Sequence, residues 1–194
     1  MTFSVETGDD EPTPGSNTLV LGPRPSARDL VTRVEQARAN TRAAAPLVVV
    51  TVRHSVESIL EAWQAETGSI PPQLHVIDVG ETIRSAAAAR EPSTHQLCGA
   101  TVSVVADDDL PGLQTAITTA LDRWDDQEPP WLWLDGVTDL VVHHGLQTAF
   151  RFLHVITVRV RATGAIGYYT AVEGEHTDVA VTTLAQLCDE LLEG

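Results

Sequence analysis

The sequence predicts an α/β protein of three layers, α-β-α, built on one mainly parallel sheet. Three observations lead to this prediction. Short apolar runs alternate with helical patterns along most of the chain, as in proteins whose parallel strands are joined by helices. The run at residues 47–52 is rich in valine and unbroken, which is typical of a central strand buried on both faces. A helical period over 150–162 predicts the crossover that parallel neighbours need.

The predicted strands are apolar runs that follow turn residues. Pro46 stands before the second of them, and the pairs Pro71–Pro72 and Pro129–Pro130 precede two others. Proline disfavours helix in the residue before it and tends to introduce an extended segment. In chain order the strands are expected at residues 18–21, 47–52, 74–79, 102–105, 131–134 and 165–169.

The predicted helices show apolar residues at helical spacing and capping residues at their ends. Asp109 and the two aspartates before it favour a helix start, and Gly164 favours a helix stop. Residues 158–161 alternate like a strand, but the longer 3.6-residue period around them favours a helix. The helices are expected at residues 26–39, 57–66, 110–124, 150–162 and 181–192, and the alanine-rich segment 85–90 fits a helix or a loop.

Residues 1–16 are acidic and rich in turn formers, which predicts a poorly ordered tail, and residues 17–194 are expected to form one domain. With 43% hydrophobic residues the chain can bury a sizeable core. No apolar run approaches the roughly 20 residues that span a bilayer, and the N-terminus has no signal pattern. We therefore expect a cytoplasmic protein without a membrane segment.

Charge is the most unusual feature of the composition. The formal net charge is −15, and all 12 basic residues are arginine. An acid-rich surface without lysine is expected where salt is molar, because the Debye length there falls to about 3 Å and self-repulsion is screened. The composition resembles that of proteins from extremely halophilic archaea. It argues against nucleic acid binding, which usually needs a basic patch. An acidic docking face for a basic partner remains the alternative interpretation.

The segment 22–29 follows the first predicted strand and begins a helix, where a phosphate-binding P-loop of pattern G-x-x-x-x-G-K-[ST] would lie. Gly22 occupies the first glycine position, but Ala27, Arg28 and Asp29 occupy the second glycine, lysine and hydroxyl positions. Two prolines also remove N–H donors from the loop. A carboxylate at position 29 would repel a bound phosphate.

Four ordered segments together resemble the RecA/KaiC branch of P-loop ATPases. The sequence VVVTVRH resembles the strand that ends in catalytic glutamates, and WLWLDGVTDL resembles a Walker B strand with its D-S-[VL]-T-x-L continuation. The chain also resembles a haloarchaeal family of KaiC-like proteins without a working P-loop. The resemblance implies the strand order 5-1-4-3-2, with the strand that ends at Asp135 beside the strand that ends at Gly22. The four segments are 18–31, 48–57, 131–140 and 163–170. Residues 184–189 then resemble the helix that follows the last of these segments in that family.

The resemblance implies a degenerate nucleotide site at Gly22, Arg28, Asp29 and Asp135. Only Asp135 matches its family position, that of the Walker B carboxylate, while Arg53 and His54 replace the glutamates that orient water. Phosphoryl transfer needs these parts to act together. We therefore expect a pseudo-ATPase that needs no cofactor and acts through a protein partner or a homo-oligomer. The alternative is an ATP-binding protein or weak ATPase in which Arg28 replaces the lysine and Asp135 holds Mg²⁺.

Arg24, Arg28, Arg53 and His54 all follow predicted strands on one rim of the sheet. Two interpretations of this rim remain open. The side chains can pair with carboxylates in a network that has replaced the nucleotide, or they can hold an anion or an acidic partner segment. Asp135 can equally serve only to cap the turn at Gly136. The carboxylates considered for the network are Asp29, Glu57, Glu81 and Asp135.

The remaining candidate residues favour structural roles. His143–His144 and the pair His95 and Cys98 have no third ligand at zinc-site spacing, so no metal site is expected. Cys98 and Cys188 are far apart, and free cysteine is commonly buried. We expect both cysteines in the core.

Overall fold

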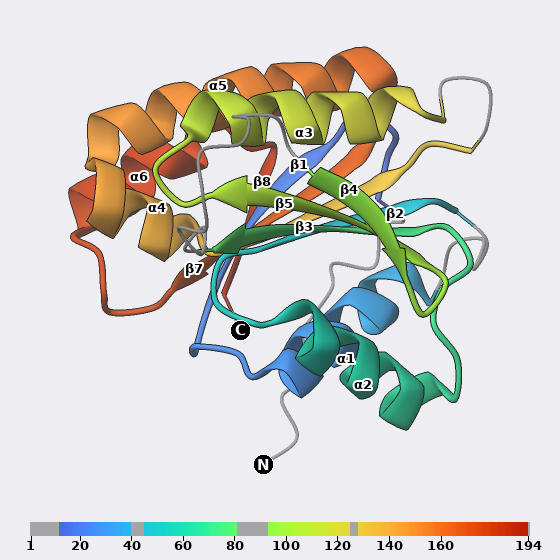
Figure 1. Cartoon of the computed structure of the whole chain (residues 1–194). Helices are drawn as coiled ribbons and strands as arrows, with labels where there is room; N and C mark the ends of the chain where they lie inside the picture. Colours follow the sequence, from blue (N-terminus) through green and yellow to red (C-terminus); the bar gives the residue numbers. More distant parts are fainter. Residues whose placement is uncertain (1–11, 40–44, 81–92, 125–127, 194) are drawn as a thin grey trace.

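The computed structural model describes residues 12–39, 45–80, 93–124 and 128–193. Its eight strands form one sheet in the order β4-β5-β3-β2-β6-β7-β1-β8, in which every neighbouring pair is parallel except β4 and β5. Helices α3, α4, α5 and α6 cover one face of the sheet, and α1 and α2 cover the other (Figure 1). The predicted fold class, a three-layer α-β-α domain with a mainly parallel sheet, is confirmed.

The strands are β1 (Asn17–Gly22), β2 (Leu47–Thr51), β3 (Leu74–Gly80), β4 (Ser93–Leu97), β5 (Ala100–Ala106), β6 (Trp131–Asp135), β7 (Ile166–Val172) and β8 (Glu190–Glu193). The helices are α1 (Ala27–Arg38), α2 (Val56–Thr67), α3 (Leu110–Asp122), α4 (Val137–His144), α5 (Leu146–Thr163) and α6 (Asp178–Ala185). None of the helices in the described ranges has both the length and the apolarity needed to cross a bilayer.

The valine run of β2 shows why the central strands are apolar on both sides. Val48 and Val50 belong to the core beneath α3 and α5, whereas Leu47 and Val49 belong to the core above α1 and α2. Successive side chains of a strand point to opposite faces, so a strand between two helical layers must be apolar at every position. The prediction of a strand buried on both faces at 47–52 is confirmed.

The predicted strand order is wrong, because the strand that ends at Asp135 does not lie beside the strand that ends at Gly22. Strand β6, which ends at Asp135, pairs with β2 and β7, and β7 separates it from β1. Two errors explain the difference. The prediction includes β3 among the five strands of the order, but β3 pairs with β2 on the side away from β6. The prediction also assigns β8, which pairs with β1, to a helix. Five strands remain when β3, β4 and β5 are left out. If β1, β2, β6, β7 and β8 are numbered 1 to 5 in chain order, they lie across the sheet in the order 5-1-4-3-2.

The C-terminal helix ends earlier than predicted. Helix α6 stops at Ala185, and β8 replaces the last part of the helix expected at 181–192. Asp189 explains this change because its backbone N–H donates to the Asn17 carbonyl oxygen over 2.8 Å, and its side chain accepts from the Asn17 N–H over 2.8 Å. These long-range bonds to β1 compete with helix continuation, and no local pattern in the sequence reports them.

A β-hairpin at β4–β5 was also missed, and it changes the place of one cysteine. Its turn holds Cys98 at φ 49° and Gly99 at φ 90°, and Cys98 is exposed rather than in the core. Cys188 is half-buried against the core, and burial raises the pKa of its thiol to about 12. The segments 1–11 and 85–90 lie outside the described residues. Gly15, at the end of the predicted tail, donates its N–H to the Ala165 carbonyl oxygen over 2.8 Å.

A buried histidine predicts acid sensitivity. His75 on β3 is buried, its Nε2 lies 2.9 Å from the Ser103 hydroxyl, and burial lowers its pKa to about 4. The unfolded chain binds this proton near pH 6.5, so stability is full above that pH and falls as the pH drops toward 4. We expect a loss on the order of 3 kcal/mol across this window. In His75→Gln, urea unfolding should show a flatter pH profile; parallel profiles in the two proteins would refute this origin.

Candidate functional site

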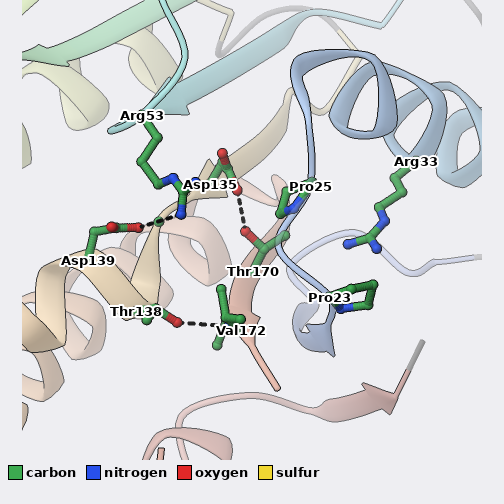
Figure 2. A pocket seen from close by; sticks show the side chains of 11 residues that line it. Pro23, Pro25, Arg33, Arg53, Asp135, Thr138, Asp139, Thr170 and Val172 are labelled. Atoms are coloured by element: carbon green, nitrogen blue, oxygen red, sulfur yellow. Dashed lines mark hydrogen bonds and ion pairs between the residues drawn. The ribbon is translucent and has the colours of Figure 1, made fainter. Parts of the chain in front are cut away.

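The candidate site lies where the carboxyl ends of β2, β6 and β7 meet the loop after β1. In α/β sheets ligands usually bind at this edge. Pro23 and Pro25 from the loop, Arg53 from the β2–α2 turn and Asp135 from β6 line a small pocket with Arg33 of α1 (Figure 2). The cavity holds about 10 Å³, which is roughly the room that one water molecule needs.

Asp135 is the central group of the site. Its carboxylate is only 3% exposed, and Oδ1 accepts a hydrogen bond from the Thr170 hydroxyl over 2.8 Å (Figure 2). Oδ2 lies 3.6 Å from Nε2 of His54, and neither of these two buried atoms has a hydrogen-bond partner among the described residues. Burial raises the pKa of Asp135, while the Thr170 hydroxyl and the His54 ring act to lower it. The Asp135 carboxylate thus lies between the end of β7 and the turn after β2.

A threonine hydroxyl shapes the turn that presents His54 and Arg53. The Thr51 hydroxyl accepts from the His54 N–H and donates to the His54 carbonyl oxygen, both over 3.0 Å. This compact turn directs the Arg53 guanidinium toward α4, where its Nη1 lies 3.9 Å from Oδ2 of Asp139. Arg53 and His54 thus each face an internal carboxylate.

Arg24 ties the loop after β1 to two other segments. Its Nη2 donates to both carboxylate oxygens of Glu175, over 2.7 and 2.5 Å, and its Nη1 lies 3.7 Å from Oδ1 of Asp139. Burial raises the pKa of Asp139, and the Arg24 charge opposes that shift. Because Asp139 also faces Arg53, one carboxylate of α4 joins both arginines.

Arg24, Arg53 and His54 therefore each face a carboxylate, as the network interpretation of the rim expects. One partner, Asp135, is among the carboxylates considered, whereas Asp139 and Glu175 are not. Within the described ranges Asp29 and Glu57 make no ion pair with this rim, and Glu81 lies outside those ranges.

Arg28 and Asp29 lie away from the pocket. The Arg28 side chain is 74% exposed, and its Nε lies 2.6 Å from Oε1 of Glu66 on α2. Asp29 forms a capping box with Ser26: the Ser26 N–H and hydroxyl donate to Asp29 Oδ2 over 2.9 and 2.6 Å. These bonds lower the pKa of Asp29. The structure accordingly places these two residues in the first turn of α1 rather than at a phosphate.

Gly22 and Asp135 stand at two strand ends that β7 separates. Gly22 is the last residue of β1, and its carbonyl oxygen accepts from the Glu173 N–H over 2.9 Å. Of the four residues predicted to form the degenerate nucleotide site, only Asp135 lines the pocket. The structure does not bring the other three to its carboxylate.

The junction of β6 with α4 needs a glycine. Gly136 has φ 121°, and a Cβ at this position would lie 2.7 Å from Cγ2 of Val52. The close approach lets α4 start directly after Asp135. Thr138 then accepts from the Val172 N–H over 2.7 Å, and its hydroxyl lies 2.8 Å from Nε2 of His176 (Figure 2 shows the Val172 bond).

Four site residues received no role in the sequence analysis: Arg33, Thr138, Asp139 and Thr170. Thr138 and Asp139 lie within the DGVTDL segment that resembles the Walker B continuation, so the motif contained a usable signal. Thr170 follows the aromatic part of its strand and could have been noted as a hydroxyl at a strand end. Arg33 gave no signal because its contribution depends on the angle at which α1 packs.

In the described ranges, no three His, Cys, Asp or Glu side chains are placed so that they could hold a metal ion. His143 and His144 occupy the last turn of α4, and Nε2 of His144 lies 3.1 Å from the Asp107 carbonyl oxygen. A helix C-terminus carries partial negative charge and favours such residues.

Three comparisons bear on this chain. Its residues 15–194 match the model of the "Family of unknown function (DUF7504)", and the chain belongs to that family. No curated protein matches it. Among 178 matching solved chains is one from a structural study of a Pyrococcus horikoshii OT3 protein, with 12% identity, a TM-score of 0.60, and coverage of 92% of this chain and 81% of that one. At this identity the likeness shows the fold alone.

Proposed function

We propose that this member of the DUF7504 family is a pseudo-ATPase of the RecA/KaiC type that regulates or scaffolds through protein contacts. The observation that carries the proposal is the state of Asp135. The carboxylate at the Walker B position is held by Thr170 and faces His54, in a cavity of about 10 Å³. A Walker B aspartate must instead face a hydrated Mg²⁺ beside a triphosphate.

The strand order supports the resemblance on which this proposal rests. When β3, β4 and β5 are left aside, the remaining five strands stand in the order 5-1-4-3-2. Strand β1, which precedes the degenerate loop, and strand β6, which ends at Asp135, then lie on either side of β7. The pocket therefore lies at the strand ends where the family resemblance puts the nucleotide.

The loop after β1 supports the loss of phosphate binding. Pro23 and Pro25 line the pocket and have no backbone N–H to offer. Arg28, at the lysine position, reaches Glu66 instead. Since the phosphate-binding parts act as a unit, their joint loss should remove most of the several orders of magnitude in rate that such sites supply.

The second candidate is a protein that binds a nucleotide or another anion without hydrolysing it. One observation favours it: Arg33 lines the pocket, and within the described ranges it makes no ion pair closer than 4.0 Å. Against it stand Asp135 and Asp139, two carboxylates at the same opening. We favour the first proposal, with a cytoplasmic location and no nucleic acid partner given the net charge of −15.

ATP hydrolysis tests the first proposal. Phosphate release from millimolar ATP with Mg²⁺, in molar salt, should equal that of a buffer blank. The matched control is Asp135→Asn, which keeps the shape of the side chain and removes its charge; the two proteins should give the same rate. A rate that is measurable in the natural protein and falls at least about tenfold in the variant would show that Asp135 serves catalysis.

A further inference from the structure

Helix α5 carries basic residues and no acidic ones, in a molecule that is acidic as a whole. The helix carries Arg151, Arg159 and Arg161 and has no Asp or Glu in its 18 residues. By contrast, α2 on the opposite layer carries three glutamates and no basic residue. In a chain of net charge −15, α5 therefore has three positive charges and no negative charge of its own, before its ion pairs with other segments are counted.

Apolar side chains lie on the same face. Val155 is 41% exposed and Val158 is 49% exposed. Residues separated by three and four positions lie on one side of a helix. We define the α5 face as the exposed row that this spacing produces: Thr148, Arg151, Val155, Val158 and Ala162.

Two of the three arginines of α5 are held by neighbouring segments. Arg159 pairs with Asp122 at the end of α3, and Arg161 pairs with Asp189 over 3.1 Å. Arg151 is exposed and makes no ion pair within the described ranges. Helices α3 and α5 run side by side over the sheet (Figure 1), and every residue of the α5 face is exposed.

We infer that the α5 face is a docking surface for a helix of another protein, one with an apolar stripe flanked by carboxylates. The two valines would contact the stripe, and Arg151 would face a flanking carboxylate. Charge complementarity between Arg151 and the carboxylates favours such a partner and disfavours a basic one. A second copy of this chain is disfavoured, since two α5 faces would bring arginines together. This inference rests on the proposed action through protein contacts and names the surface used.

A designed peptide pair tests the chemistry. The probe is a helical peptide of about 20 residues, long enough to hold a helix, with a leucine stripe flanked by glutamates; its twin carries lysines instead. Fluorescence anisotropy at about 0.15 M salt should show the glutamate peptide binding at least about tenfold tighter. Arg151→Glu, and separately Val155→Ser with Val158→Ser, should each weaken binding about tenfold. Val179→Ser, at a valine on α6 that is 73% exposed, is the matched control.

Equal binding of the two peptides, or binding that the α5 variants leave unchanged, would overturn the inference. So would a dimer in sedimentation that Arg151→Glu dissociates, because a second copy would then cover the face. The variants lie outside the pocket, so circular dichroism and the ATP assay should match the natural protein. ATP hydrolysis would refute the pseudo-ATPase proposal alone, whereas failed peptide binding would refute the α5 inference alone.

Discussion

Replacing Gly136 with alanine is expected to lower the free energy of unfolding by about 4 kcal/mol. The backbone at φ 121° is rarely open to residues with a side chain, and holding it there costs about 1–3 kcal/mol. The new methyl would also lie 2.7 Å from Cγ2 of Val52, and such overpacking costs about 1–3 kcal/mol. Urea unfolding measures the loss directly.

Two further variants separate these causes. Gly68 also has a positive φ, 77°, but nothing lies within 4 Å of a Cβ there, so Gly68→Ala should cost only the backbone part. Adding Val52→Ala to Gly136→Ala should restore some stability because it removes the clashing methyl. If Gly136→Ala is no worse than Gly68→Ala, the close packing of β6 against the β2 turn does not hold the site together as described.

A rise in salt concentration should increase the free energy of unfolding by an amount similar to the loss expected for Gly136→Ala. We treat the folded protein as a uniformly charged sphere with the net charge of −15. Between about 0.1 and 2 M salt, screening lowers its repulsion energy, relative to that of the expanded chain, by an amount on the order of 5 kcal/mol. Salting-out ions also strengthen burial of the apolar core. For a domain of this size the melting temperature should rise by about 10 °C or more. Calorimetry across the salt series measures it.

The control for the salt effect reduces the charge without touching ion pairs described above. Glu57, Glu61 and Asp108 are exposed, and replacing them with Gln, Gln and Asn changes the formal charge from −15 to −12. Repulsion scales with the square of the charge, so the electrostatic part of the salt effect should shrink by about a third. A flat melting temperature in the natural protein would show that the acidity is not an adaptation to salt, and would favour an acidic docking face.

The sequence was informative where one local signal dominates. The valines of β2 predicted a strand buried on both faces, and Gly164 with the long helical period predicted α5 over a competing strand pattern. Pairing between distant segments left no local signal. Strand β8 depends on hydrogen bonds between Asp189 and Asn17, which are 172 positions apart, and the neighbours of β6 depend on how all the strands add to the sheet.

The candidate site shows the same contrast between local signals and contacts of distant segments. Asp135 was predicted because a carboxylate at the end of an apolar strand is a local pattern. Its neighbours come from other segments: Thr170 from β7 donates a hydrogen bond to it, His54 from the β2 turn faces it, and Arg33 from α1 lines the same pocket. The place of Arg28 in the first turn of α1 follows from the local sequence, but its partner, Glu66 on the neighbouring helix, does not.

Thermal unfolding with ATP and Mg²⁺ tests the central claim that internal side chains close the nucleotide position. Samples with millimolar Mg²⁺-ATP are compared with samples of matched ionic strength without nucleotide, because the protein is expected to respond to salt itself. The account predicts a shift of less than about 1 °C. Nucleotide present at about 100 times its Kd would stabilise the native state by about 2.7 kcal/mol and raise the midpoint by about 5–10 °C. Such a rise, lost in Arg33→Ala, would contradict the account.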